Sequence, residues 1–117
     1  MRHRRSTTAR LSRDRSERRH LLRDLSNALI LNGAITTTQQ KARFVRPYVE
    51  RAITVSKGGD LVAKQRLQSI LANPVAEKKL RDELSATYAA RQGGYTRVVK
   101  LGKREGDRAA LVRLELV

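Results

Sequence analysis

The chain has 117 residues, no cysteine and a formal net charge of +15. One small domain is expected at this length, and the charge directs it towards polyanions such as nucleic acid or an anionic membrane surface. The lack of thiols excludes disulfide scaffolds, zinc knuckles and cysteine catalysis, and an aromatic content of 3% disfavours base-stacking sheets and aromatic membrane anchors.

The first 23 residues carry nine arginines against two carboxylates, Asp14 and Glu17. The first ten have no apolar side chain beyond Met1 and Ala9, so they cannot form a core. Such a segment stays extended until a polyanion neutralises it. Because guanidinium groups pair with phosphate through two parallel hydrogen bonds, residues 1–13 are predicted to be an RNA-binding arm. The arm would precede a single α+β domain, residues 14–117.

A mitochondrial transit peptide is an alternative interpretation of this segment, because such leaders are rich in Arg and Ser and poor in acids. The basic run continues directly into a predicted helix whose apolar face belongs to the core, which favours the arm. Apolar runs such as residues 28–31 are far too short for a membrane span. No apolar region follows the first arginines, so a secretory signal is not expected.

The first predicted helix begins near Asp14 and Glu17, which have capping-box spacing. It ends at Asn32-Gly33, because glycine accepts the positive φ of a helix C-terminus. Its predicted buried stripe consists of Leu21, Leu22, Leu25, Ala28 and Leu29.

A short β-favouring run, residues 34–37, leads into the second predicted helix, with Thr37 and Gln40 as its capping box. Pro47 falls inside this helix, so a kink or a broken first segment is expected there. The inward side consists of Ala42, Val45, Val49, Ala52 and Ile53.

Gly58-Gly59 closes the second helix, and Asp60 is expected to cap the third, residues 61–71. Asn73-Pro74 starts the fourth, since proline at the first helical position loses no hydrogen bond. The fourth helix is expected to end before Gly93-Gly94, with Glu77 on its solvated face. The predicted inward residues of these two helices are Ala63, Leu67, Ile70, Leu71, Ala76, Leu80, Leu84 and Tyr88.

After Gly93-Gly94 the apolar period changes to two, which predicts strands at 95–101 and 109–117 around a loop at 102–108. The loop is rich in Lys and Arg, so this tip either touches a phosphate or is simply solvated. The expected fold class is α+β. About four helices pack on a small mixed or antiparallel sheet that ends in a C-terminal β-hairpin, with an extended basic N-terminal arm.

The sequence does not support an enzyme, a metal site or a cofactor. His3 and His20 lie among arginines, where protonation is disfavoured and phosphate contact is more natural than general-base chemistry. The carboxylate pairs 14/17 and 82/83 are typical of a helix cap and a solvated helix face. No phosphate-cradling GxxxxGK[ST] pattern and no GxGxxG pattern occurs.

A winged helix-turn-helix protein that binds DNA is the competing interpretation. Residues 21–51 hold two predicted helices, and the C-terminal hairpin would be the wing. Two features weaken it: the densest charge lies in the arm, and the link at 32–36 is strand-like. The residues that would reach base edges in the major groove are Gln39, Gln40, Lys41 and Arg43.

A set of short stretches runs in order over nearly the whole chain. They are Met1-Arg2-His3, Gly33 to Thr38 with Lys41-Ala42, Val45-Arg46-Pro47, Gly93 to Arg97 with Lys100-Leu101, Gly106-Asp107, and Glu115-Leu116-Val117. Together they resemble the bacterial large-subunit ribosomal protein seventeen family. The chain departs from the family pattern at residues 6–11 and at Ala109-Ala110.

The resemblance implies a structural constituent of the large ribosomal subunit that binds and stabilises large-subunit rRNA. It implies a ribosome-bound, cytoplasmic protein near the mouth of the polypeptide exit tunnel, beside other large-subunit proteins, with no membrane and no small-molecule substrate. A-form RNA is recognised mainly through phosphates, 2′-hydroxyls and shape, which suits an aromatic-poor basic protein.

Two groups of basic residues are expected to bind rRNA. The first consists of Arg2, His3, Arg4, Arg5, Arg10, Arg13, Arg18, Arg19 and Arg23. The second consists of Lys41, Arg46, Arg97, Lys100 and Lys103. Tyr95 is expected either in the core or in a turn, formed with Gly93-Gly94, that approaches RNA closely.

Overall fold

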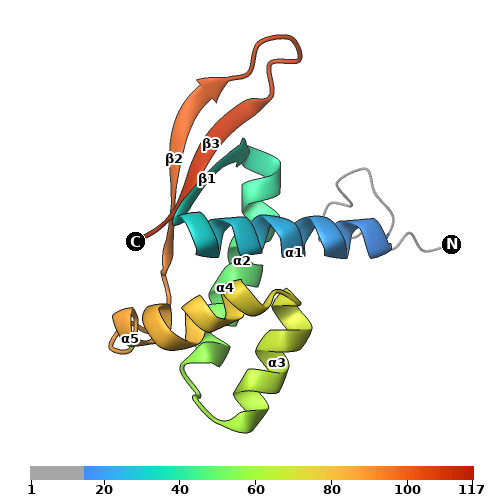
Figure 1. Ribbon diagram of the computed structural model, residues 1–117. Helices are drawn as coiled ribbons and strands as arrows, with labels where there is room; N and C mark the ends of the chain where they lie inside the picture. The colour runs from blue at the N-terminus through green and yellow to red at the C-terminus, as the bar shows by residue number, and fades with distance from the viewer. Residues whose placement is uncertain (1–14) are drawn as a thin grey trace, which may run out of the picture.

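The computed structural model describes residues 15–117 (Figure 1). The predicted arm and Asp14 of the first predicted cap lie outside the described residues. The elements in chain order are α1 (Arg15–Asn32), β1 (Ala34–Thr38), α2 (Gln39–Ser56), α3 (Leu61–Leu71), α4 (Pro74–Lys79), the π-helical segment η1 (Leu80–Leu84), α5 (Ser85–Thr87), β2 (Thr96–Lys103) and β3 (Ala110–Leu116). The α+β fold class is confirmed, and α4, η1 and α5 take the place of the fourth predicted helix.

The three strands form one antiparallel sheet in the order β1-β3-β2. β3 is the central strand. In its pairing with β1, Leu114 lies opposite Ile35. The register of β2 shifts between Lys100 and Gly102, and Gly102 has a φ of +116°. This positive φ suits glycine at a β-bulge. The β2–β3 hairpin extends away from the helices, as Figure 1 shows.

α2 runs from the sheet to the lower helices and forms the centre of the core (Figure 1). It contacts α1, α3, η1, α5 and all three strands. The predicted inward side is confirmed, since each of its five side chains is at most 1% exposed. The helix continues through Pro47, so the predicted broken segment is wrong. Pro47 is exposed, and water can therefore reach the carbonyl of Arg43 that lacks its helical donor.

The buried face of α1 differs from the predicted leucine stripe. Ile30 and two polar residues, Ser26 and Asn27, are buried, whereas Leu22 and Leu25 are only partly buried against the core. Hydrogen bonds from both side chains offset part of the cost of this burial, while Asn27 Oδ1 has no hydrogen-bond partner among the described residues. Ser26 donates to the carbonyl of Leu22 at 2.6 Å, and the Asn27 amide donates to a carbonyl of α3 at 3.0 Å.

The C-terminal end of α3 is held by side chains from α1 and α2. The last carbonyls of a helix have no intrahelical donor. Here the carbonyls of residues 69, 70 and 71 accept from Arg23 at 3.3 Å, the Tyr48 hydroxyl at 2.6 Å and the Asn27 amide at 3.0 Å, respectively. Three polar side chains therefore fix the position of α3 against the core.

The helix caps agree with the sequence at two of three positions. Asp60 accepts from the N–H of Ala63 at 2.8 Å, and Asn73 accepts from two N–H groups of α4, so both predicted caps are confirmed. The predicted cap Thr37 is wrong, because this residue belongs to β1 and is buried. Thr38 caps α2 instead by accepting from the N–H of Lys41 at 3.3 Å.

Glu77 is 5% exposed, which contradicts its predicted place on a solvated face. α4 packs against α1 and α3, and the Glu77 carboxylate is compensated by Arg81 one turn away at 3.2 Å. The helical region also ends at Thr87, earlier than predicted. Inward residues four apart drift by about 40° per step on an α-helix. The wider π-helical turn offsets this drift and keeps Leu80, Leu84 and Tyr88 buried.

Truncation of Leu67 tests this core. Leu67→Ala is expected to lower the free energy of unfolding by about 2–5 kcal/mol, because the fully buried side chain leaves a cavity. Leu61→Ala on the same helix is the matched control, since Leu61 is 67% exposed and its loss should change stability by about 0.5 kcal/mol or less. Urea denaturation followed by circular dichroism measures both, and equal losses would contradict the described core.

Candidate nucleic-acid interface

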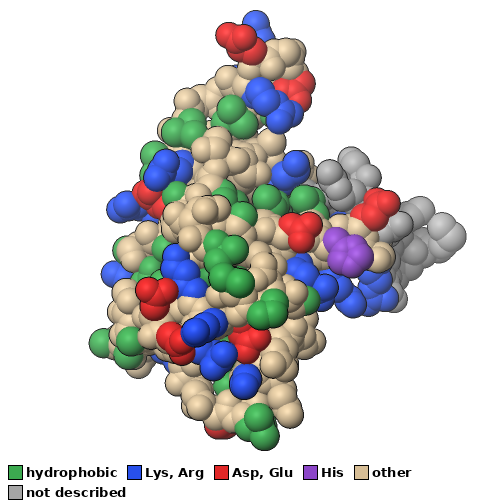
Figure 2. Space-filling view, in the orientation of Figure 1, with side chains coloured by type: hydrophobic (Ala, Val, Ile, Leu, Met, Phe, Trp, Pro, Cys, Tyr) green, Lys and Arg blue, Asp and Glu red, His purple; other side chains and the backbone are tan. Residues whose placement is uncertain are grey.

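The first turns of α1 present arginines that no described residue neutralises. Arg15 and Arg19 are exposed and Arg18 is half-buried, and none of the three has a partner within residues 15–117. Figure 2 shows Lys and Arg side chains beside the histidine at this end of α1. Cations at a helix N-terminus are repelled by the helix dipole, so a nearby anion is favourable. Arg23, predicted with this group, instead donates to the carbonyl of Ser69.

The hairpin is a second basic surface. Every residue of β2 after Thr96 is exposed, and Lys100, Lys103 and Arg108 have no partner within the described chain. Arg97, by contrast, pairs with Glu115 at 2.7 Å. Hydrogen bonds from this guanidinium and then from that of Arg113 lower the pKa of the Glu115 carboxyl. Lys100 and Lys103 therefore keep their charge available to a partner, whereas the charge of Arg97 is largely balanced.

Asp107 organises the hairpin tip. Its carboxylate accepts from Arg104 Nε at 3.1 Å and from the N–H of Ala109 at 3.1 Å. These hydrogen bonds lower the Asp107 pKa to about 2. The bond from Arg104 has the larger effect, and the bond from the Ala109 N–H is second. The tip thus has a defined turn that holds Arg104 in place.

The start of α2 and the hairpin enclose a groove of about 1200 Å³. Its lining residues are Thr38, Gln39, Gln40, Lys41, Ala42, Arg43, Phe44, Arg46, Pro47, Val98, Arg104, Ala109 and Ala110. Four of these are basic and none is acidic. Arg46 is held by Thr96, whose hydroxyl accepts from its Nε at 2.9 Å, and it also pairs with Glu50.

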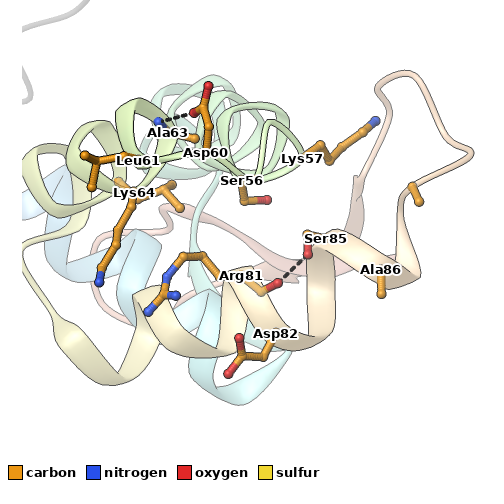
Figure 3. Close-up of a pocket in the computed structure, with 13 residues that line it drawn as sticks. Ser56, Lys57, Asp60, Leu61, Ala63, Lys64, Arg81, Asp82, Ser85 and Ala86 are labelled. Carbon is orange, nitrogen blue, oxygen red and sulfur yellow. Dashed lines mark hydrogen bonds between the residues drawn. The ribbon is translucent and has the colours of Figure 1, made fainter.

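A smaller cavity of about 620 Å³ lies between the end of α2, the start of α3 and the η1–α5 region (Figure 3). Its charged lining is mixed, with Lys57, Lys64 and Arg81 against Asp60 and Asp82. The Asp60 carboxylate caps α3, as the dashed line in Figure 3 shows. This cavity has little surplus charge for an anionic ligand, so the groove is the better candidate site.

Tyr95 belongs to the core. It is 1% exposed, and its ring centroid lies 5.2 Å from that of Tyr88. Its hydroxyl accepts from Lys57 Nζ at 2.9 Å and donates to the carbonyl of Arg91 at 3.1 Å. The hydrogen bond from Lys57 lowers the Tyr95 pKa. An RNA contact at this turn would therefore use the backbone of Gly93 and Gly94.

The exposed basic residues in the described part of the chain offer anion-binding chemistry. Within residues 15–117, no three or more His, Cys, Asp or Glu side chains are grouped so that they could hold a metal ion. No helix in this part of the chain is long and apolar enough to span a bilayer. The predicted RNA-binding residues Arg2, His3, Arg4, Arg5, Arg10 and Arg13 lie outside the described residues.

The arrangement also differs from a winged helix-turn-helix. The link between α1 and α2 is β1, a strand paired with β3, where a helix-turn-helix has a tight turn. The four residues expected to read DNA bases line the groove, with Val98 and Arg104 of the hairpin region on its other side. The hairpin and α2 thus share one surface.

Comparison with known proteins extends over nearly the whole chain. Residues 21–117 match the sequence model of the family described as ribosomal protein L17. The chain belongs to the ribosomal protein L17 family. The resemblance noted in the sequence is therefore confirmed, and the matched range includes the groove and the hairpin but begins after Arg15, Arg18 and Arg19.

Several curated relatives in the ribosomal protein L17 family cover the chain almost completely. The large ribosomal subunit protein bL17 of Akkermansia muciniphila is 46% identical over 110 residues, which span 94% of this chain and 81% of the relative. The protein of the same name from an Exiguobacterium species is 46% identical over 114 residues, which span 93% of this chain and 97% of that relative. The protein of the same name from a Thermoanaerobacter species is 45% identical over 107 residues, which span 92% of this chain and 96% of that relative.

Sequence reasoning connected Arg15 with nearby phosphates, and placed Arg104 and Arg108 in a hairpin tip that either touches a phosphate or is solvated. It did not name these three among the residues expected to bind rRNA. It considered Arg43 only for DNA and did not single out Phe44. The composition of the 102–108 loop indicated its charge, but nothing local indicated that this loop lies beside α2.

The pH dependence of the hairpin tip tests the Asp107 bond network. The Asp107 pKa falls from its ordinary 3.8 to about 2 on folding, so its contribution is fully present above about pH 4 and is lost as the pH falls through about 2. Carboxyl ¹³C shifts measured by NMR should give this midpoint, and the Ala109 amide shift should follow it. In Asp107→Asn, the Ala109 amide shift should no longer change with pH in this range. A wild-type midpoint near 3.8 would contradict the described tip.

Proposed function

We propose that this member of the ribosomal protein L17 family is a structural constituent of the large ribosomal subunit that binds large-subunit rRNA. Its relatives carry the name large ribosomal subunit protein bL17. The observation that best supports RNA binding is the group Arg15, Arg18 and Arg19, whose guanidinium groups have no described partner directly after the basic arm. A net charge of +15 attracts a polyanion such as RNA.

The proposed mechanism is phosphate neutralisation. The arm and the first turns of α1 lie between RNA segments, where their guanidinium groups pair with phosphates that would otherwise repel one another. Lys100 and Lys103 of the exposed hairpin add contacts at a second site. The α+β body positions these groups, and no chemical step, cofactor or small-molecule substrate is involved. The family resemblance supports a place in cytoplasmic ribosomes near the mouth of the exit tunnel, beside other large-subunit proteins.

Co-sedimentation tests the proposed function directly. The purified protein is expected to sediment with large ribosomal subunits after a high-salt wash, and not with small subunits. A chain that lacks residues 2–13 is expected to be washed off at lower salt. Stronger binding to one duplex DNA sequence than to rRNA, lost in Gln39→Ala and Arg43→Ala, would instead support the winged-helix interpretation.

The salt dependence of rRNA binding tests the role of the arm. If the arm contacts about six phosphates, the slope of log K against log salt should be near −4, at about −0.7 per phosphate. Removal of residues 2–13 should flatten this slope and leave the thermal unfolding midpoint nearly unchanged, since the core lies in residues 15–117. An unchanged slope would show that the contacts lie elsewhere.

A matched pair of double variants tests the start of α1. Arg18→Gln with Arg19→Gln should change the slope by about 1.4, because two phosphate contacts are lost. Lys64→Gln with Arg66→Gln removes the same charge from exposed positions of α3 and should change it much less. Filter binding at several salt concentrations measures both. Equal changes would mean that only net charge matters.

A further inference from the structure

We propose that the groove between α2 and the hairpin binds an unpaired nucleotide of RNA, with its base on Phe44 and its phosphates beside Lys41 and Arg43. The inference rests on the proposed function for the identity of the partner. It adds that the recognised feature of the RNA is an unpaired base, and not the backbone of a regular duplex.

The charge of the groove selects an anion. Its basic residues are Lys41, Arg43, Arg46 and Arg104, and no carboxylate is among its lining residues. Arg46 and Arg104 are held in place by Thr96 and Asp107. The side chains of Lys41 and Arg43 have no partner within residues 15–117, so they are available for phosphate.

The apolar part of the groove lining favours a planar apolar group. Phe44 is the only phenylalanine of the chain, and it stays partly exposed in this groove, where Pro47 and Ala109 also contribute apolar surface. Across from α2, Val98 of the hairpin is 37% exposed. Aromatic side chains bind unpaired bases by stacking, whereas bases inside a duplex have both faces covered. A site for phosphate alone would need no such apolar lining.

Two glutamines in the groove lining can contact base edges. Gln39 and Gln40 are exposed on the first turn of α2, and both line the groove. Each carries an amide that donates and accepts hydrogen bonds. The volume of about 1200 Å³ accommodates a nucleotide with its flanking phosphates. The lining therefore combines cationic, apolar and amide side chains, which match the phosphates, the faces and the edges of a nucleotide.

Fluorescence of a labelled oligonucleotide tests the inference in the full chain. The probe is a short single-stranded RNA with 2-aminopurine at its centre, whose emission is quenched when the base stacks. Wild-type protein should quench it. Phe44→Leu, which keeps an apolar side chain of similar size, should abolish the quenching and weaken binding about tenfold. Circular dichroism melting shows whether this variant folds.

Arg43→Gln provides a second variant, because Arg43 is exposed and its replacement should not disturb the core. It should weaken oligonucleotide binding several-fold, whereas Arg51→Gln, an exposed position farther along α2 and outside the groove lining, should not. A duplex RNA of the same sequence should compete poorly for the quenched signal. Full quenching by Phe44→Leu, or equal weakening by Arg43→Gln and Arg51→Gln, would overturn the inference.

Two further outcomes separate this inference from the proposed function. Co-sedimentation with large subunits but no quenching by wild-type protein would overturn the nucleotide site and leave the proposed function in place. Quenching that persists without co-sedimentation would overturn the proposed function alone. Displacement of the oligonucleotide by polyglutamate more readily than by unlabelled RNA would show that the groove accepts an acidic peptide, and would overturn the nucleotide assignment.

Discussion

The apolar face of α2 is the part of the core to which nearly every other element is fitted. Small and β-branched side chains such as Ala42, Val45 and Val49 let neighbouring elements approach closely, and α2 contacts both helices and strands. The same helix carries Arg43 and Arg46 at exposed positions. Burial of the apolar face therefore fixes where these basic residues lie relative to the hairpin, so that core packing determines the shape of the groove.

Elements governed by local patterns were predicted well from the sequence. The inward face of α2, the Asp60 and Asn73 caps and the two strands of the hairpin all follow from apolar spacing and cap chemistry within a few residues. Buried polar groups were not predictable in this way. Asn27 is buried where it bonds a carbonyl at the end of α3, far along the chain, and Glu77 is buried because α4 packs against α1 and α3, with Arg81 one turn away compensating its charge. Such burial depends on tertiary partners, which periodicity does not record.

The candidate site, too, was only partly predictable from the sequence. Composition indicated which residues are basic, but the structure distinguishes free cations from paired ones. Arg97 and Arg46 are bonded across elements that are distant in sequence, whereas Arg43 and Lys100 are not. Phe44 gains its candidate role only because the hairpin, more than fifty residues later, lies beside it. A single aromatic residue among many cations gives no sequence signal until that neighbour is known.

The pairing of Ile35 with Leu114 has a kinetic consequence. β1 precedes the main helical region and its partner β3 follows it, so this pairing closes a long loop and is intrinsically slow compared with helix formation. During folding, the helices can collapse on one another while the sheet is still incomplete. A partly folded chain would then carry its positive charge without the groove, which forms only when the central strand has docked.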